Sequence, residues 1–292
     1  MPAKWFICPD QQRVEIEKCL APGGCRLKNR CAPMAYLRAA SFDREWKGIS
    51  PSSAGSDARL IWLKAVKPYA VDPASRAFSL LGTAVHGKLS LHDYNVLAEE
   101  TLSDEQMQGV ADLLEKNEYG RGYILTDYKT FGSYKVMKCL GIKQVTVQIQ
   151  DENGEPARFK SGQRKGKIKT KREMEIKPEH IDMKAEILQL NRYRIFFEKN
   201  GFPVSRMQLF CIVRDGGTRQ ARSNMIDRNV YTVPVPRLDN KKVLSFYNEL
   251  DRRVKAAFEQ NDAPMCSDEL SWNGRRCKSF CEVSEYCGYT SH

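Results

Sequence analysis

The chain has 292 residues, of which 41% are hydrophobic and 28% are charged, and its formal net charge is +11. This composition excludes an intrinsically disordered protein, and the length allows one large domain or two small ones. The basic excess favours a polyanionic partner, with nucleic acid foremost; the alternative is a charge that serves solubility alone. No apolar run is long enough to cross a bilayer and no signal-peptide h-region follows Met1, so we expect a cytoplasmic protein without a membrane partner.

The pattern of residues predicts three parts along the chain: a Cys-rich metal knuckle over 1–34, a core over 35–262 and a Cys-rich segment over 263–292. In chain order, the first half of the core is expected to contain a helix from Ala35, a helix that begins after Ser56 or Asp57 and ends near Val66, and a long buried helix over 76–98. A hairpin of strands 105–114 and 122–127 and a solvent-facing strand over 143–150 follow. The second half is expected to contain a helix over 182–199, strands over 206–213 and 230–235, and an amphipathic helix over 239–260. Strands interleaved with helices predict an α/β fold with a mixed central sheet flanked by helices.

Residues 151–180 interrupt this pattern, because few of them are suited to a core. Nine Lys or Arg lie between Arg158 and Lys177. We interpret the segment as a mobile basic hairpin or loop that binds a phosphate backbone with salt-dependent affinity. The alternative is a solvated hairpin without a ligand. The residues expected to contact DNA are Lys160, Arg164, Lys165, Lys167, Lys169, Lys171 and Arg172.

Most of the ten cysteines lie near the two ends of the chain. The N-terminal group is Cys8, Cys19, Cys25 and Cys31, and the C-terminal group is Cys266, Cys277, Cys281 and Cys287. In a reducing compartment such groups indicate metal binding rather than disulfides. Four thiolates suit either Zn²⁺ or an iron–sulfur cluster, and two separate sites are possible. Cys139 and Cys211 lie in apolar stretches and are expected to be packing residues.

A short, β-prone apolar run ends at Asp127-Tyr128-Lys129. Asp127 and Lys129 share one face of the strand because side chains alternate. A carboxylate beside an ammonium suits metal-assisted hydrolysis of phosphodiesters, because the carboxylate holds a hard divalent cation and the lysine orients the attacking water. Asp112 lies fifteen residues earlier, within reach through a hairpin. His86 is a candidate nitrogen ligand that favours Mn²⁺ somewhat over Mg²⁺.

Each of these residues also has an ordinary structural interpretation: a surface ion pair, a turn carboxylate or a core histidine. Further along the chain, Gln189 and Tyr193 lie four residues apart on one predicted helix face. The amide and the phenol suit phosphate oxygens or the displaced end of a DNA strand. The alternative for this pair is a half-buried helix face without a ligand.

The order of these motifs resembles the RecB-like branch of the PD-(D/E)XK nucleases, which includes CRISPR-associated exonucleases and the nuclease domains of helicase–nuclease complexes. The resemblance extends over residues 82–193 and consists of Gly82-x-x-x-His86, Gly109-x-x-Asp112, Asp127-Tyr-Lys-Thr130 and Gln189-x-x-x-Tyr193. It implies a restriction-endonuclease-like core in which Mg²⁺ or Mn²⁺ is bound by His86, Asp112, Asp127 and the Tyr128 carbonyl. It also implies that Lys129 acts on the water, and that Gln189 and Tyr193 position DNA.

The C-terminal cysteines are a second point of resemblance. Several RecB-like nucleases join three C-terminal cysteines and one nearer the N-terminus around a [4Fe–4S] cluster, and Cys277, Cys281 and Cys287 resemble that trio. The helix that usually carries the fourth ligand is here the one over 56–66, and it has no cysteine. Cys266 and Cys31 are the two candidates to replace it. For the N-terminal group zinc, a cluster and unliganded thiols all stay open.

Together these features predict a divalent-metal-dependent deoxyribonuclease. The expected activity is that of an exonuclease on single strands or DNA ends, in recombination, repair, or phage- or CRISPR-type DNA processing. Two alternatives stay open: a metal-stapled nucleic-acid-binding protein without catalysis, and a nuclease subunit that is active only with a helicase or recombinase partner.

Overall fold

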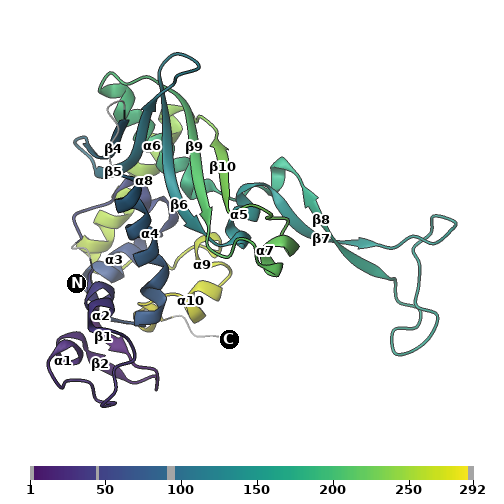
Figure 1. Cartoon of the computed structure of the whole chain (residues 1–292), viewed down its shortest axis with the longest axis horizontal. Helices are drawn as coiled ribbons and strands as arrows, with labels where there is room; N and C mark the ends of the chain where they lie inside the picture. The colour runs from purple at the N-terminus through teal and green to yellow at the C-terminus, as the bar shows by residue number, and fades with distance from the viewer. Residues whose placement is uncertain (1–2, 44–45, 91–95, 289–292) are drawn as a thin grey trace. The chain divides into compact units, whose positions relative to one another are not determined.

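The computed structural model describes residues 3–43, 46–90 and 96–288, and Figure 1 shows the order of their elements. The chain divides into two units. The first contains residues 1–127, 184–207 and 235–292, and the second contains residues 128–183 and 208–234. Both cysteine groups belong to the first unit, and the basic segment belongs to the second.

A small mixed sheet with the order β2-β1-β3 forms part of the first unit. Its strands are β1 (Ala3–Ile7), β2 (Arg13–Glu15) and β3 (Tyr69–Val71). β1 is antiparallel to β2 and parallel to β3, and Phe6 lies opposite both Val14 and Val71. The short helix α1 (Ile16–Leu20) follows β2, and a loop leads from it to α2 (Met34–Ser41). This loop carries two of the N-terminal cysteines.

One hydrophobic cluster joins the two ends of the described chain. Phe6 and Cys19 from the N-terminal part pack in it with Trp62 from α3 (Ala58–Val66) and with Val283 and Cys287 from the C-terminal part. Burying an apolar side chain of this size stabilises a fold by about 1.5–3 kcal/mol. Both cysteine-rich segments are therefore part of one core.

The larger sheet has the strand order β10-β9-β6-β5-β4. Its strands are β4 (Val96–Ser103), β5 (Gln108–Lys116), β6 (Tyr123–Phe131), β9 (Val204–Val213) and β10 (Val230–Val235). β5 is antiparallel to both β4 and β6. The predicted hairpin of β5 and β6 and the predicted strands β9 and β10 are confirmed.

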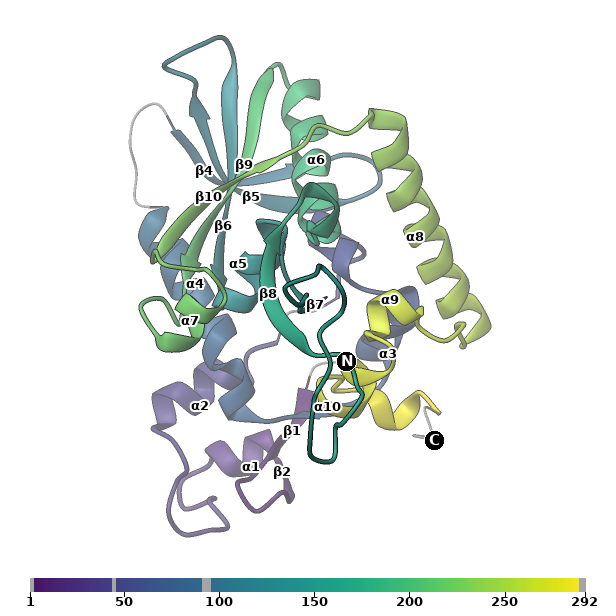
Figure 2. The same ribbon diagram turned by 90° about the vertical axis from the view of Figure 1, so that its right-hand side faces the viewer.

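Within the first unit, helices pack against one another and against β4, as can be followed in Figure 2. Helix α6 (Lys184–Lys199) packs against β4, and α8 (Asn240–Gln260) packs against α6 and α3. Asp57 caps α3 by accepting a hydrogen bond from the backbone N–H of Arg59 at 3.2 Å, which decides between the two expected caps. The predicted α/β class, with a mixed sheet and flanking helices, is confirmed at this level.

The predicted long buried helix over 76–98 is wrong in length and in burial. Helix α4 spans Ala77–Leu89, and residues 96–98 begin β4; residues 91–95 lie outside the described part of the chain. No residue of α4 is buried, and Phe78 and Leu81 are exposed. Leu81, Val85 and Leu89 do recur at helical spacing, but Leu81 and Leu89 are exposed, so the apolar face that suggested burial is not covered in the described part of the chain.

In the second unit β7 (Ile142–Gln148) and β8 (Thr170–Ile176) form an antiparallel hairpin. Isolated bridges, such as the one between Arg158 and Ile168, continue the pairing beyond the strands. The hairpin interpretation of the basic segment is therefore confirmed, and the loop interpretation is wrong over 170–176. Pairing along their full length satisfies the backbone hydrogen bonds of these largely exposed strands.

The remaining elements are short: the helices α5 (Ser133–Cys139), α7 (Arg219–Ser223), α9 (Asp268–Ser271) and α10 (Arg275–Ser279), and the 3₁₀ turns η1 (Pro51–Gly55), η2 (Pro73–Arg76), η3 (Pro178–His180) and η4 (Ser284–Tyr286). The predicted packing role of Cys139 and Cys211 agrees with their side chains, which are almost fully buried. In the described residues no helix has both the length and the apolar character that a membrane span requires.

Candidate active site and cysteine groups

An imidazole and two carboxylates lie together where α4 meets the β4–β5 pair. His86 Nδ1 is 3.3 Å from Asp112 Oδ1 and 3.6 Å from Glu99 Oε1. One ligand atom from each of the three residues lies within 4.8 Å of the others. One nitrogen and two carboxylate oxygens at this spacing are a suitable ligand set for Mn²⁺ or Mg²⁺.

The strand registers align three acidic residues across the sheet. Ala98 pairs with Leu113 and Glu100 with Ala111, so Glu99 lies level with Asp112. Leu113 pairs with Thr126, so the next position along places Asp127 level with Asp112. Like charges opposite each other destabilise an antiparallel pair. A cation at this row would relieve the repulsion.

Glu99 is the site residue that the sequence reasoning missed. Its φ of +53° is uncommon for a residue other than glycine, and such strain is concentrated at functional sites. The feature that could have revealed Glu99 is the turn before β5. There the Asp104 side chain accepts hydrogen bonds from the backbone N–H groups of Gln106 and Met107. A hairpin centred on this Asx-type turn places Glu99 opposite Asp112 by counting alone.

The environment of His86 favours its protonated form in the metal-free protein. The hydrogen bond with Asp112 raises the pKa of His86, and the charges of Asp112, Glu99 and Asp127 add to this effect while burial opposes it. The imidazole and the three carboxylates therefore share one electrostatic neighbourhood. A metal ion would replace the proton as the positive charge among them.

Helix α6 presents the predicted Gln189 and Tyr193 to Asp127. Gln189 Nε2 donates to Asp127 Oδ1 at 3.2 Å, and the Asp127 side chain is only 2% exposed. Burial raises the pKa of Tyr193 well above its usual value, and the charge of Asp127 adds to the rise. The phenol therefore stays protonated at neutral pH and is a hydrogen-bond donor.

Gly109 allows the close approach of β5 to this helix. A Cβ atom at Gly109 would lie 2.6 Å from Pro51 Cδ and 2.9 Å from Tyr193 Cε1. No side chain fits between β5 and the tyrosine ring without displacing a neighbour. The glycine of the Gly109-x-x-Asp112 motif is thus explained by packing.

Tyr128 and Lys129 continue β6 into the second unit, where both are half-buried. The Tyr128 ring packs edge-on against Phe210, with ring centroids 6.1 Å apart. Side chains alternate along a strand, so Lys129 lies on the same side of β6 as Asp127. The catalytic role of Lys129 and the ligand role of the Tyr128 carbonyl stay predictions.

The C-terminal cysteines gather beside helix α3. Cys266, Cys277 and Cys281 line one cavity. Burial, together with the charges of Asp57 and of the other three cysteines of the group, Cys287 included, raises the pKa of Cys266 to about 11. Cys266, rather than Cys31, therefore accompanies the expected trio.

Helix α3 contributes an arginine to this group in place of the expected cysteine. Arg59 Nε donates to Cys287 Sγ at 3.2 Å, and the same guanidinium pairs with Asp262. Four thiols with a cationic donor fit a thiolate-bound cluster, whose negative charge such a donor offsets. The N-terminal cysteines, Cys31 included, line a separate cavity.

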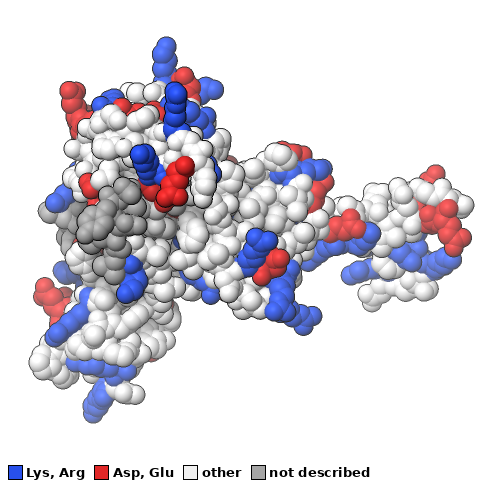
Figure 3. All heavy atoms as spheres, turned by 45° about the horizontal axis from the view of Figure 1, so that its top comes forward, with Lys and Arg blue, Asp and Glu red and all other residues white. Residues whose placement is uncertain are grey.

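The predicted DNA-binding residues all lie on the β7–β8 hairpin of the second unit. Lys169 is half-buried and the other six are exposed. Arg164 and Lys169 stack over the ring of Phe159, 6.0 and 5.7 Å from its centroid. Figure 3 shows basic side chains along this segment, interrupted by acidic ones. The hairpin combines exposed positive charge with an aromatic ring, a combination found in proteins that bind single strands.

Comparison with known proteins identifies no family for this chain. No family model matches it, and the search of curated proteins finds no match. The geometry described above is therefore the basis for a functional proposal, and the resemblance to RecB-like nucleases stays a prediction.

Proposed function

We propose that the chain is a divalent-metal-dependent deoxyribonuclease with a RecB-like PD-(D/E)XK core, acting as an exonuclease on single strands or DNA ends. The observation that carries the proposal is the grouping of His86, Glu99 and Asp112 within 4.8 Å. The alignment of Asp127 with Asp112 across β5 and β6 supports it. Three carboxylates beside one imidazole support a cation site more than a single surface ion pair would.

The residues have distinct roles in this proposal. His86, Asp112 and Asp127 hold the ion, with Glu99 as an additional carboxylate and the Tyr128 carbonyl as a further ligand. A divalent ion bound there supplies a nucleophilic water and polarises a phosphoryl oxygen. Gln189 fixes the orientation of the buried Asp127 carboxylate through its 3.2 Å hydrogen bond.

The remaining groups act on the substrate. Lys129 shares its strand face with Asp127 and orients the attacking water. Tyr193, kept protonated by its raised pKa, donates a hydrogen bond to a phosphate oxygen. The β7–β8 hairpin binds the DNA backbone, with Phe159 as a stacking surface for a base. Cys266, Cys277, Cys281 and Cys287 would hold a [4Fe–4S] cluster, which would tie the C-terminal segment to α3.

The test incubates end-labelled single-stranded DNA with the protein and Mn²⁺. Asp112→Asn and Asp127→Asn are expected to abolish cleavage, and Glu99→Gln to raise the Mn²⁺ concentration that cleavage requires. Glu100→Gln is the matched control, because this neighbour of Glu99 faces the other side of β4. Cleavage that survives Asp127→Ala or Lys129→Ala would refute the assignment. A circular single-stranded DNA that stays intact while the linear strand is degraded identifies an exonuclease.

The same assay separates the two alternatives. A binding protein without catalysis holds DNA equally well with or without Mn²⁺ and never shortens it. A nuclease subunit cleaves only after a helicase or recombinase is added. Binding is measured in parallel by fluorescence anisotropy, so the absence of cleavage and the absence of binding are distinguished.

A further inference from the structure

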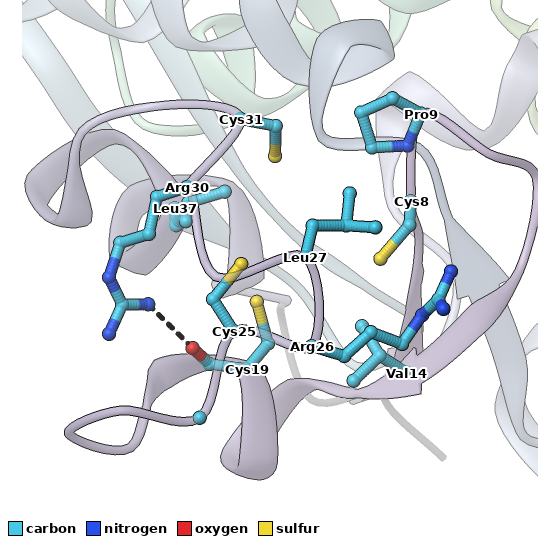
Figure 4. Close-up of a pocket in the computed structure, with 11 residues that line it drawn as sticks. Cys8, Pro9, Val14, Cys19, Cys25, Arg26, Leu27, Arg30, Cys31 and Leu37 are labelled. Carbon is cyan, nitrogen blue, oxygen red and sulfur yellow. Dashed lines mark hydrogen bonds between the residues drawn. The ribbon is translucent and has the colours of Figure 1, made fainter.

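The N-terminal cysteines surround a cavity of their own, which the proposed nuclease activity does not use. Cys8 follows β1, Cys19 lies on α1, and Cys25 and Cys31 lie in the loop before α2. Their sulfur atoms point toward a common space (Figure 4). Arg26 and Arg30 are among the other residues that line the cavity.

The backbone around this cavity brings the four cysteines together. A tight turn after β1, closed by hydrogen bonds between Cys8 and Gln12 and between Gln11 and Cys8, directs the chain back into β2. Arg30 then donates to the carbonyl oxygens of Cys19 at 2.7 Å and Ala21 at 3.0 Å, which ties the loop to the end of α1. Distant parts of a loop-rich segment thus face one point.

Little apolar packing stabilises this loop. Between α1 and α2 its only large apolar side chain is Leu27, which is exposed. Segments that bury so little apolar surface commonly depend on a metal or a disulfide for their structure. The four cysteines are free thiols, so a metal centre is the cross-link that they suit.

Two arginines border the same cavity. Arg26 forms an ion pair with Asp10, whereas the Arg30 guanidinium is held by backbone carbonyl oxygens, that of Cys19 included. Binding a metal centre would release the thiol protons, and the Arg30 charge would then lie near the four thiolates.

We propose that Cys8, Cys19, Cys25 and Cys31 bind an iron–sulfur cluster, separate from any centre on the C-terminal cysteines. Within the described residues no three cysteine sulfurs lie within 4.8 Å of one another. Tetrahedral zinc with bonds of about 2.3 Å requires sulfurs roughly 3.8 Å apart. The group also lacks the short Cys-x₂₋₄-Cys spacing of zinc knuckles. Thiolates spread around a cavity suit a cluster, in which each one binds a different iron.

The two cysteine groups are distinct sites on one core. Cys8, Cys19, Cys25 and Cys31 line one cavity, and Cys266, Cys277 and Cys281 line another. Cys19 and Cys287, one from each group, pack in the same hydrophobic cluster. A cluster at each group would therefore hold the two ends of the described chain against a shared core.

The test measures iron, acid-labile sulfide and zinc in the full chain purified without oxygen. Two [4Fe–4S] clusters correspond to about eight iron and about eight sulfide per chain. Cys25→Ser with Cys31→Ser is expected to remove half of both, as is Cys277→Ser with Cys281→Ser. Cys139→Ala, which removes a buried thiol outside both groups, is expected to change neither value.

The outcomes are decisive for each alternative. One zinc per chain that is lost with Cys25→Ser and Cys31→Ser, while iron is unchanged, overturns the proposal in favour of a zinc site. Metal contents that do not respond to this pair of changes show unliganded thiols. If the variant fails to fold, electron paramagnetic resonance of the reduced wild-type chain decides. Two spins per chain support the N-terminal cluster, as does a single spin that Cys277→Ser with Cys281→Ser leaves unchanged. A single spin that this second pair of changes removes overturns it.

Discussion

Replacing Gly109 by alanine tests the packing on which the candidate active site depends. The new methyl group would lie 2.6 Å from Pro51 Cδ and 2.9 Å from Tyr193 Cε1. Carbon atoms normally stay about 3.5–4.0 Å apart, so β5 or the tyrosine has to move by roughly 1 Å. Pro51 is a closed ring and the Tyr193 side chain is buried, so neither relaxes easily. Overpacking of this kind destabilises a protein by about 1–3 kcal/mol.

Thermal unfolding with and without Mn²⁺ measures this effect. A loss of about 2 kcal/mol lowers the melting temperature by about 4–8 °C in a protein of a few hundred residues. A displacement of Tyr193 by about 1 Å is expected to slow cleavage about 100-fold. Gly87→Ala on α4 is the matched control, because a Cβ there meets nothing within 4 Å. It is expected to stabilise the helix by about 0.5–1 kcal/mol. Equal melting temperatures for the two variants would refute the packing argument.

Three further predictions concern the metal sites and the hairpin. Mn²⁺ affinity is expected to rise with pH through the pKa of His86, which its hydrogen bond with Asp112 raises above the usual 6.5, because the ligand must be neutral. The stability of the metal-free protein depends on pH in the opposite direction: charged His86 stabilises the fold fully below about pH 6.5, and this stability is lost as the pH passes the raised pKa. His86→Gln should remove both pH dependences. A Mn²⁺ affinity that does not depend on pH contradicts the ligand role of His86. Arg59→Gln, which removes the donor to Cys287, is expected to speed iron loss to a chelator about tenfold, whereas Arg252→Gln on the exposed face of α8 should not; equal rates rule out a role for this donor. The last change replaces three hairpin lysines by glutamine: Lys167, Lys169 and Lys171. The salt dependence of single-strand binding should then weaken by about 0.7 for each phosphate that is no longer neutralised, or about 2 in total, and an unchanged slope places the DNA elsewhere.

Much of the site's framework was predictable because it depends on local alternation. The apolar run before Asp127 has the pattern of a buried strand, and it forms part of β6. A hairpin that returns from Asp127 brings Asp112 beside it, as the observed register does. Gln189 and Tyr193 lie on one helix face because they are four residues apart. Each of these relations spans a strand or a helix whose geometry is regular.

Relations that depend on chain reversal were harder to predict. Glu99 was missed because the leucines before it suggested a helix, and the turn at Asp104 carried the decisive information in a side-chain hydrogen bond. The companion of the C-terminal cysteine trio was left open for a similar reason. The backbone N–H of Ser267 lies 3.5 Å from Asp57 Oδ2, and this hydrogen bond brings Cys266 beside α3. Sequence spacing contains no trace of such an interaction between residues far apart in the chain.

The hydrophobic cluster shared by the two ends of the described chain also governs when the protein acquires its structure. The ribosome must translate as far as Val283 before the cluster that contains Phe6 is complete, although the strand neighbours Val14 and Val71 are made early. Nascent chains usually fold from their N-terminal side, but here the core around the first strand is completed late. A translation product cut short before that point keeps apolar surface in contact with water and is a substrate for cellular proteases. For the proposed nuclease, this dependence would keep truncated fragments from accumulating.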